Sequence, residues 1–159
     1  MHVADFGAGS GAYVLLIAKA LEGFGRVYAV DIQRDLLRRI GNEARKRGYT
    51  NVDIVWGDLT ERSGSRLGEK NIDLVLISNV LFQVEDKAAL FREARRVLRP
   101  RGRVAIIDWK ESFGGMGPQR ANIVTKEEAL SLAKEADLEL QREFPAGAHH
   151  YGLMLRLTQ

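Results

Sequence analysis

The chain alternates short apolar strands with amphipathic helical segments along its whole length. The patterns predict strands at His2–Phe6, Arg26–Asp31, Val52–Trp56, Ile72–Ser78, Arg103–Asp108, Leu138–Glu143 and Tyr151–Leu157. They predict helices at Gly11–Leu21, Arg34–Arg47, Asp86–Leu98 and Thr125–Ala136. Strands that alternate with helices are typical of a parallel sheet with right-handed crossovers. We therefore expect a doubly wound, Rossmann-like α/β fold.

The expected sheet has seven strands, is mostly parallel and ends in an antiparallel C-terminal hairpin, with the strand order 3-2-1-4-5-7-6. No linker or internal repeat divides the sequence, so we expect residues 1–159 to form a single domain. The ligand crevice of such a fold lies at the carboxyl ends of the first and fourth strands, where the strand order reverses.

The amino-acid composition excludes several kinds of functional site. The 159 residues contain no cysteine, which excludes disulfides, thiolate metal ligands and cysteine nucleophiles. The three histidines do not have metal-ligand spacing, so we expect no metal site. The sequence begins without a basic leader and has no apolar run long enough to span a bilayer, which favours a cytoplasmic protein without membrane contact.

A glycine-rich turn follows the first strand. Gly7, Gly9 and Gly11 allow a tight turn and a close approach of a ligand to backbone N–H groups at the start of a helix. Gly7, Gly9 and Ala12 also fit the weak G-x-G-x-x-A pattern of dinucleotide-binding proteins. The turn alone therefore leaves the ligand open.

Acidic residues at three strand ends narrow the choice of ligand. Asp5 precedes the turn, where a carboxylate would repel a pyrophosphate but attract a cationic amine or sulfonium. Asp31 ends the second strand and is placed to accept ribose hydroxyls, although NAD enzymes have a similar acid. Asp58 follows the third strand, where it can accept from an adenine amino group. The set favours an amino-acid-bearing nucleoside without phosphates.

Five segments in order resemble the class I S-adenosylmethionine-dependent methyltransferases. They are Val3–Gly11, Val27–Asp31, Trp56–Leu59, Ile72–Lys87 and Arg96–Trp109. The branch most resembled contains quinone-biosynthesis C-methyltransferases and other small-molecule enzymes. Two departures stand out: Arg101 replaces a usual glycine, and the N-terminal capping helices of the family are missing.

The resemblance implies that S-adenosylmethionine is the cofactor and S-adenosylhomocysteine the product. It places the methionine moiety near Asp5 and the glycine turn, the ribose at Asp31, the adenine at Asp58, and the methionyl backbone at Asn79. The cofactor-binding residues expected in this way are Asp5, Phe6, Gly7, Ala8, Gly9, Asp31, Ile32, Gly57, Asp58, Leu59 and Asn79.

A catalytic base is required only when the acceptor has a proton to lose. Asp108 ends the fifth strand, and His150 lies at the start of the last one, so we expect these two as catalytic candidates. Candidate walls of an acceptor pocket are Phe82, Trp109, Phe113 and Met116, and the glycine-rich segment 111–121 is a candidate lid.

The acceptor stays open at this point, with a small molecule favoured. Arginine outnumbers lysine 17 to 7 in a chain of net charge +3, and arginines cluster on two of the predicted helices. This pattern keeps an RNA (tRNA) methyltransferase as an alternative. A non-catalytic, cofactor-binding partner subunit is a third reading. We expect a homodimer in which a second chain covers the uncapped cofactor site.

Overall fold

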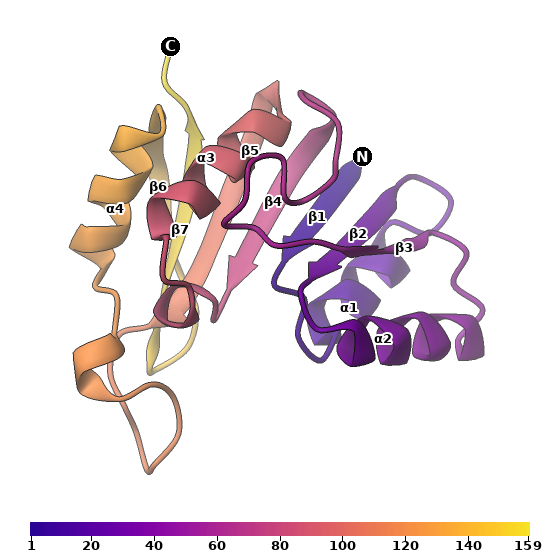
Figure 1. Cartoon of the computed structure of the whole chain (residues 1–159), viewed down its shortest axis with the longest axis horizontal. Helices are drawn as coiled ribbons and strands as arrows, with labels where there is room; N and C mark the ends of the chain where they lie inside the picture. The colour runs from indigo at the N-terminus through magenta and orange to yellow at the C-terminus, as the bar shows by residue number, and fades with distance from the viewer.

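The computed structural model describes all residues from Met1 to Gln159. Seven strands form one sheet in the order β3-β2-β1-β4-β5-β7-β6, as predicted (Figure 1). The first four strands have the predicted bounds: β1 His2–Phe6, β2 Arg26–Asp31, β3 Val52–Trp56 and β4 Ile72–Ser78. The others are β5 Leu98–Trp109, β6 Leu138–Pro145 and β7 His150–Leu157, and only β7, between β5 and β6, runs antiparallel to the other strands.

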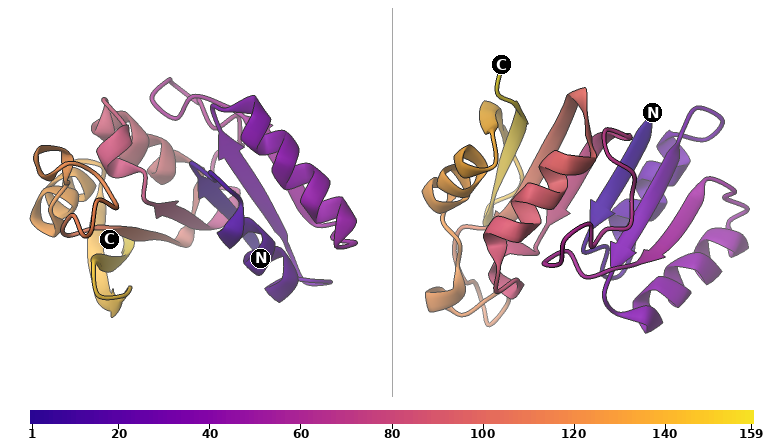
Figure 2. Two further views of the ribbon diagram at one scale, coloured as in Figure 1. Left: turned by 90° about the horizontal axis from the view of Figure 1, so that it is seen from below. Right: turned by 45° about the horizontal axis from the view of Figure 1, so that its top comes forward.

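Helices cover the two faces of the sheet unequally. On one face, α3 (Lys87–Val97) and α4 (Lys126–Glu135) close the larger core, which includes Phe6, Phe91 and Ile106. On the other face, α1 (Ala12–Ala20) and α2 (Arg34–Lys46) pack against β1, β2 and β3 (Figure 2). Right-handed crossovers account for this division of the helices.

The second face of β4, β5 and β7 carries no helix. Ile107 and Met154 on this face are only half-buried, whereas their neighbours Ile106 and Leu153 on the other face are fully buried. The alternation of side chains along a strand accounts for the contrast, because successive residues point to opposite faces. This half of the sheet therefore presents an apolar surface that the chain itself leaves open.

No helix of the chain combines the length and hydropathy that a bilayer crossing requires.

Strand β5 begins five residues earlier than predicted. Between the β4–β5 pairs Ile72–Leu98 and Leu74–Arg103, β4 advances two residues and β5 advances five, so three extra residues bulge from β5. Pro100 and Gly102 lie in this bulge, and both residue types are typical of bulges and strand edges. The structure adds two short 3-10 helices, η1 (Leu81–Gln83) and η2 (Arg120–Asn122).

The segment between β3 and β4, residues 57–71, has neither helix nor strand but is firmly held. Glu93 of α3 is buried, and its Oε1 accepts hydrogen bonds from the backbone N–H and the hydroxyl of Ser65. Arg96 bonds the same carboxylate and also donates to the carbonyl of Leu67 at 2.8 Å. These bonds lower the pKa of Glu93 despite its burial, so the carboxylate stays charged and paired.

Candidate cofactor cleft

The turn after β1 is built around two close approaches. Gly7 has φ 78°, and a Cβ there would lie 2.6 Å from Val80 Cγ2. Gly11 has φ 81°, and its Cβ would lie 2.5 Å from Ile40 Cγ1. Only glycine accommodates both the positive φ and the packing at these positions. The turn therefore passes between α2 and the β4 exit and opens its backbone toward the carboxyl edge.

Asp31 at the end of β2 fixes this turn. Its Oδ2 accepts from the Gly9 N–H at 3.0 Å, and its Oδ1 accepts from the Gln33 N–H at 2.9 Å. The side chain is nearly buried, and each carboxylate oxygen keeps a further lone pair. The carboxylate can therefore hold the turn and accept two neighbouring hydroxyls of a ligand.

Asp5 is 2% exposed, and the negative charge of Asp31 acts on it electrostatically. Burial, with a smaller contribution from Asp31, raises the pKa of Asp5 to about 7. Two more acceptor atoms nearby, Ser78 Oγ and Asn79 Oδ1, are buried without any hydrogen-bond partner. Buried polar atoms without partners are rare in proteins. These three oxygen-bearing groups fit a ligand that brings a cation or several N–H donors.

Asp58 follows β3 and closes a tight local turn. Its Oδ1 accepts from the backbone N–H of Thr60 at 2.9 Å and from the Thr60 hydroxyl at 2.6 Å, and these bonds lower its pKa. Its Oδ2 makes no hydrogen bond within the chain and can accept from a ligand amino group. Gly57 has a packing reason of its own, since a Cβ there would lie 2.0 Å from the Gly64 carbonyl oxygen.

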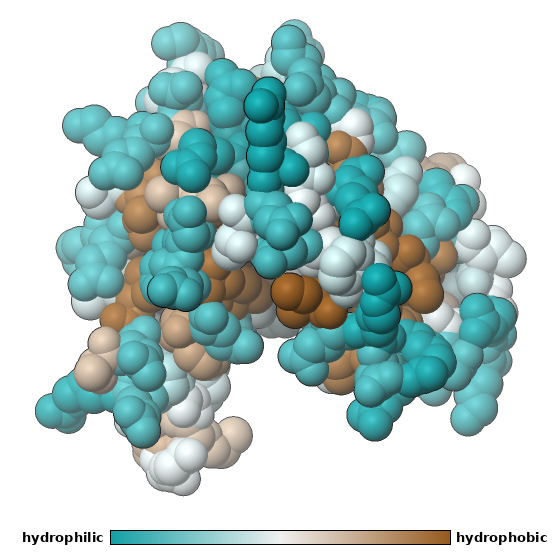
Figure 3. All heavy atoms as spheres, viewed as in Figure 1, coloured by the Kyte–Doolittle hydropathy of each residue, from teal (hydrophilic) through white to brown (hydrophobic).

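These groups line two adjoining cavities at the carboxyl edge of the sheet. A cavity of about 320 Å³ contains Asp31 and Asp58, and one of about 300 Å³ contains Asp5 and Asn79. Both are lined by Gly7, Gly9 and Gln83, so they form one cleft, which we call the cofactor cleft. Figure 3 shows a notch at this edge, with hydrophobic residues gathered inside it. No lysine or arginine lines either cavity.

The cleft brings together ten of the eleven expected cofactor-binding residues; the exception is Phe6. Its side chain is fully buried in the core beneath α3, because it alternates with Asp5 along β1. The Phe6 side chain therefore does not face the cleft, and cofactor binding by Phe6 stays a prediction that concerns its backbone alone.

Sequence reasoning missed several lining residues. Gln83 of η1 lies at the junction of the two cavities and donates to the Asn79 carbonyl at 2.8 Å. Thr60, Ser78 and Tyr13 were also missed. Ser78 and Gln83 are polar residues at the exit of β4, the same edge position that identified the aspartates, and that signal was available in the sequence.

The two catalytic candidates point to opposite faces of the sheet. Asp108 pairs with Tyr151, and Trp109 pairs with His150, so Asp108 and His150 occupy successive rungs. Asp108 is fully buried and lines neither cavity of the cleft. Its carboxylate accepts from the N–H of Leu81 at 3.0 Å and of Trp109 at 2.8 Å. We therefore correct the expectation: Asp108 positions η1 and does not face the cleft.

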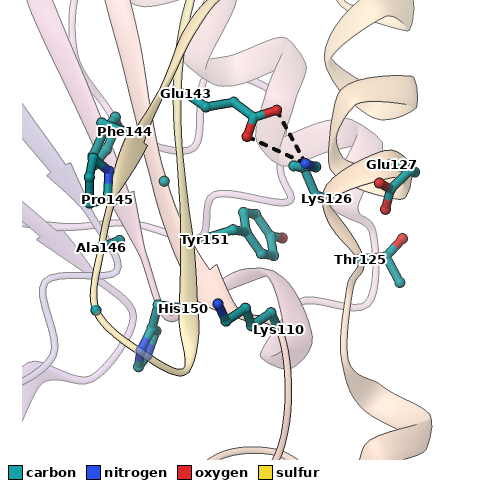
Figure 4. A pocket seen from close by; sticks show the side chains of 12 residues that line it. Lys110, Thr125, Lys126, Glu127, Glu143, Phe144, Pro145, Ala146, His150 and Tyr151 are labelled. Atoms are coloured by element: carbon teal, nitrogen blue, oxygen red, sulfur yellow. Dashed lines mark hydrogen bonds and ion pairs between the residues drawn. The ribbon is translucent and has the colours of Figure 1, made fainter.

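His150 stacks at a tilt on Trp109, with ring centroids 4.1 Å apart, and its Nε2 is buried without a partner. Burial, with a smaller effect of His149, lowers its pKa, so the ring is neutral near pH 7. His150 lines a separate polar cavity of about 680 Å³ together with Lys110 and the Lys126–Glu143 ion pair (Figure 4). The two cleft cavities share no lining residue with this one.

The expected lid segment is attached to the turn between β6 and β7. Glu111 bonds His149 Nδ1 at 2.9 Å, and Phe113 stacks on the same ring at 4.0 Å. Gly117 lies against the Trp109 ring, where a Cβ would come within 2.8 Å. Phe113 and Met116 nevertheless remain more than half exposed, so the segment leaves apolar side chains at the edge of the open sheet face.

Comparison with known proteins identifies the family. Residues 1–149 match the model of a family described as a methyltransferase domain. The arsenite methyltransferase of Aquipseudomonas alcaligenes is 27% identical over 67% of this chain and 32% of its own length. The demethylmenaquinone methyltransferase of Listeria monocytogenes is 26% identical over 92% of this chain and 65% of its own length. The chain thus spans about a third to two thirds of these relatives.

Solved structures share the fold. An S-adenosylmethionine-dependent methyltransferase from Aquifex aeolicus superimposes with a TM-score of 0.88 at 24% identity, over 98% of this chain and 81% of its own. The arsenic(III) methyltransferase of Chlamydomonas reinhardtii gives a TM-score of 0.75 at 23% identity, over 100% of this chain and 64% of its own. The family match over 1–149 and this seven-stranded fold place the chain among the class I S-adenosylmethionine-dependent methyltransferases.

Proposed function

We propose that this chain binds S-adenosylmethionine in the cofactor cleft and transfers its methyl group to an apolar, aromatic small molecule. The observation that carries the first half is the set of acceptors in the cleft. Asp5, Ser78 Oγ and Asn79 Oδ1 are buried together at one end without a cation, and Asp31 offers two oxygens at the other. This set matches a ligand with a cationic amino-acid end and a ribose.

The chemistry asks little more of the chain than placement. S-adenosylmethionine supplies a methyl group that is already activated by its sulfonium. The residues of the cleft then have to orient that group and keep water away while an acceptor atom comes within about 3–3.5 Å in line. Asp31 and Asp58 anchor the nucleoside end, and Asp5 with Asn79 anchors the cationic end.

The second half of the proposal rests on the face of the sheet that the cleft shares. Asp5, Ser78 and Trp109 all point to the same face of the sheet, which carries no helix over β4, β5 and β7. On this face beyond the cleft, Ile107 and Met154 are half-buried apolar side chains. An apolar, planar acceptor fits this surface, with the Trp109–His150 pair at its edge.

The relatives support an aromatic acceptor over an arsenic one. The demethylmenaquinone methyltransferase aligns with 92% of this chain, whereas the arsenite methyltransferases align with 67%. Arsenic(III) is a soft centre that prefers sulfur ligands, and the 159 residues contain no cysteine. His150 is neutral near pH 7 but lines a cavity separate from the cleft, so a role for it in accepting a proton from a hydroxyl-bearing acceptor stays a prediction.

RNA is the weaker acceptor class. The arginine-rich helices α2 and α3 lie on opposite faces of the sheet. Several of their arginines already bind carboxylates, among them Arg38, Arg47 and Arg96. A continuous phosphate-binding groove along both helices is therefore not formed by one chain.

Calorimetry and a methyl-transfer assay test the proposal. Titration should show binding of S-adenosylmethionine and S-adenosylhomocysteine and no binding of NAD. With radiolabelled S-adenosylmethionine, a reduced naphthoquinone should be methylated and arsenite should not. Tight NAD binding would contradict the cofactor assignment, and methylation of arsenite or of bulk tRNA with no labelling of the quinol would contradict the acceptor class.

A further inference from the structure

A second cavity of different charge lies at the amino edge of the sheet, opposite the cofactor cleft. It has a volume of about 530 Å³ and is formed by the β5 bulge, the end of α3 and the end of β7. Five cationic side chains line it, and no aspartate or glutamate side chain does: they are Lys70, Arg95, Arg101, Arg103 and Arg156. We call it the basic pocket.

The bulge in β5 places two of these arginines. A Cβ at Gly102 would lie 2.8 Å from Leu98 Cδ2 and 3.0 Å from the Arg99 carbonyl oxygen, so the chain turns back tightly on itself there. Arg101 and Arg103 flank this glycine and are both exposed. A packed, glycine-dependent turn therefore presents them beside Arg156 of the pairing strand β7.

The positive charge of the basic pocket is only partly neutralised. Arg156 contacts Glu139 at 2.8 Å, and Arg95 approaches Asp137 at 3.7 Å. Arg103 bonds the uncharged Gln141 at 2.8 Å. Lys70 and Arg101 have no ion-pair partner. Lys70, Arg101 and Arg103 thus face one hollow without forming an ion pair.

Helix ends explain only one member of this set. Cations are favoured in the last turn of a helix, where the backbone dipole is negative, and Arg95 lies in the last turn of α3. Arg101, Arg103 and Arg156 lie on strands or in the bulge, and Lys70 precedes β4. Their convergence therefore has no explanation in the capping of a helix.

We propose that the basic pocket binds a small ligand with two or more adjacent phosphate groups. The planar fork of a guanidinium matches phosphate oxygens in a bidentate way, and three free cations match the charge of an oligophosphate. The volume lies in the range of small-molecule sites. The site is separate from the cofactor cleft, because the seven residues of β4 hold the two edges roughly 20 Å apart.

The test compares two charge reversals of equal size. Inorganic tripolyphosphate is titrated at low ionic strength into the unmodified chain, into Arg101→Glu and into Arg39→Glu, which alters an exposed arginine of α2 outside both sites. We expect tripolyphosphate to bind the unmodified chain, Arg101→Glu to weaken it at least about tenfold, and Arg39→Glu to change it less than about twofold. Adding Lys70→Glu to Arg101→Glu should weaken binding further.

Two further measurements fix the interpretation. S-adenosylhomocysteine affinity and the thermal midpoint should be the same in all variants, which shows that the fold is intact. Binding of a short oligouridylate is measured in parallel. The proposal is overturned if tripolyphosphate does not bind, or if Arg39→Glu weakens it as much as Arg101→Glu does. It is also overturned if only the oligouridylate binds, because the ligand would then be an RNA on a diffuse surface.

Discussion

The two edges of the sheet carry opposite charge. The carboxyl edge gathers Asp5, Asp31 and Asp58 around cavities without any lysine or arginine. The amino edge gathers five cations around a pocket without any acidic side chain. A net charge of +3 averages these two regions and describes neither. The position of a charge relative to the strand ends is therefore a better guide to the ligand than the net charge of the chain.

Replacement of Asp31 should have the largest effect on ligand binding at the carboxyl edge. Asp31→Ala leaves the N–H groups of Gly9 and Gln33 without their acceptor and removes the oxygens proposed for the ribose. We expect affinity for S-adenosylhomocysteine to fall at least about 100-fold, equivalent to about 2.7 kcal/mol. Calorimetry measures the effect, with Asp35→Ala on exposed α2 as the control. Unchanged affinity in Asp31→Ala would exclude Asp31 from the binding site.

The pH dependence of the carboxyl edge gives the next effect in size. Asp5 has a pKa of about 7, so only its ionised form, dominant above pH 7, attracts a cationic ligand. S-adenosylmethionine should bind about tenfold more tightly at pH 8 than at pH 6. Asp5→Asn should flatten this profile, and Asp53→Asn, on β3 outside the cleft, should keep it. A flat profile in the unmodified chain would contradict the assignment.

The same residue affects folding. The folded chain holds a proton on Asp5 up to about pH 7, whereas the unfolded chain releases it near pH 4. Between these values the folded state binds more protons, so its stability falls as the pH rises. Chemical denaturation should show this slope in the unmodified chain and a weaker slope in Asp5→Asn. An equal slope in both proteins would assign the effect to other groups.

A smaller effect is expected at Asp108, which lies close to the cleft but does not line it. Asp108→Asn keeps an acceptor for one of the two N–H groups it holds and should lower the free energy of unfolding by about 1–2 kcal/mol. The turnover of the remaining folded enzyme should change little. A large loss of kcat with unchanged stability would restore Asp108 as a catalytic residue.

The last prediction concerns the effect of a change at the amino edge on ligand binding at the carboxyl edge, and this effect should be the smallest. Arg103→Ala removes a cation of the basic pocket whose only bond is to Gln141. S-adenosylhomocysteine affinity should change by less than about twofold, because the edges are separated by the length of β4 and act independently. A clear change in affinity would show that the two edges are coupled.

Most of the fold and much of the cleft could be predicted from the sequence. Acids at the ends of three apolar strands were visible as a pattern, and so was their meeting at one edge. Asp108 and His150 could not be sorted in this way, because the face to which each points depends on the β5–β7 register. The basic pocket was hidden for a similar reason: the bulge at 99–102 and Arg156 meet only after the hairpin pairs. The homodimer and the location in the cell stay predictions.

The hydrogen bonds that Glu93 accepts from Ser65 have a consequence for the motion of the cleft. Residues 57–71 look like a free connection in the sequence, yet a buried carboxylate of α3 anchors them through side-chain and backbone bonds. Asp58 and Leu59, at the beginning of this segment, therefore move with α3 and not with the solvent-exposed loops. The side of the cleft that we propose for adenine is therefore anchored to α3 through this segment.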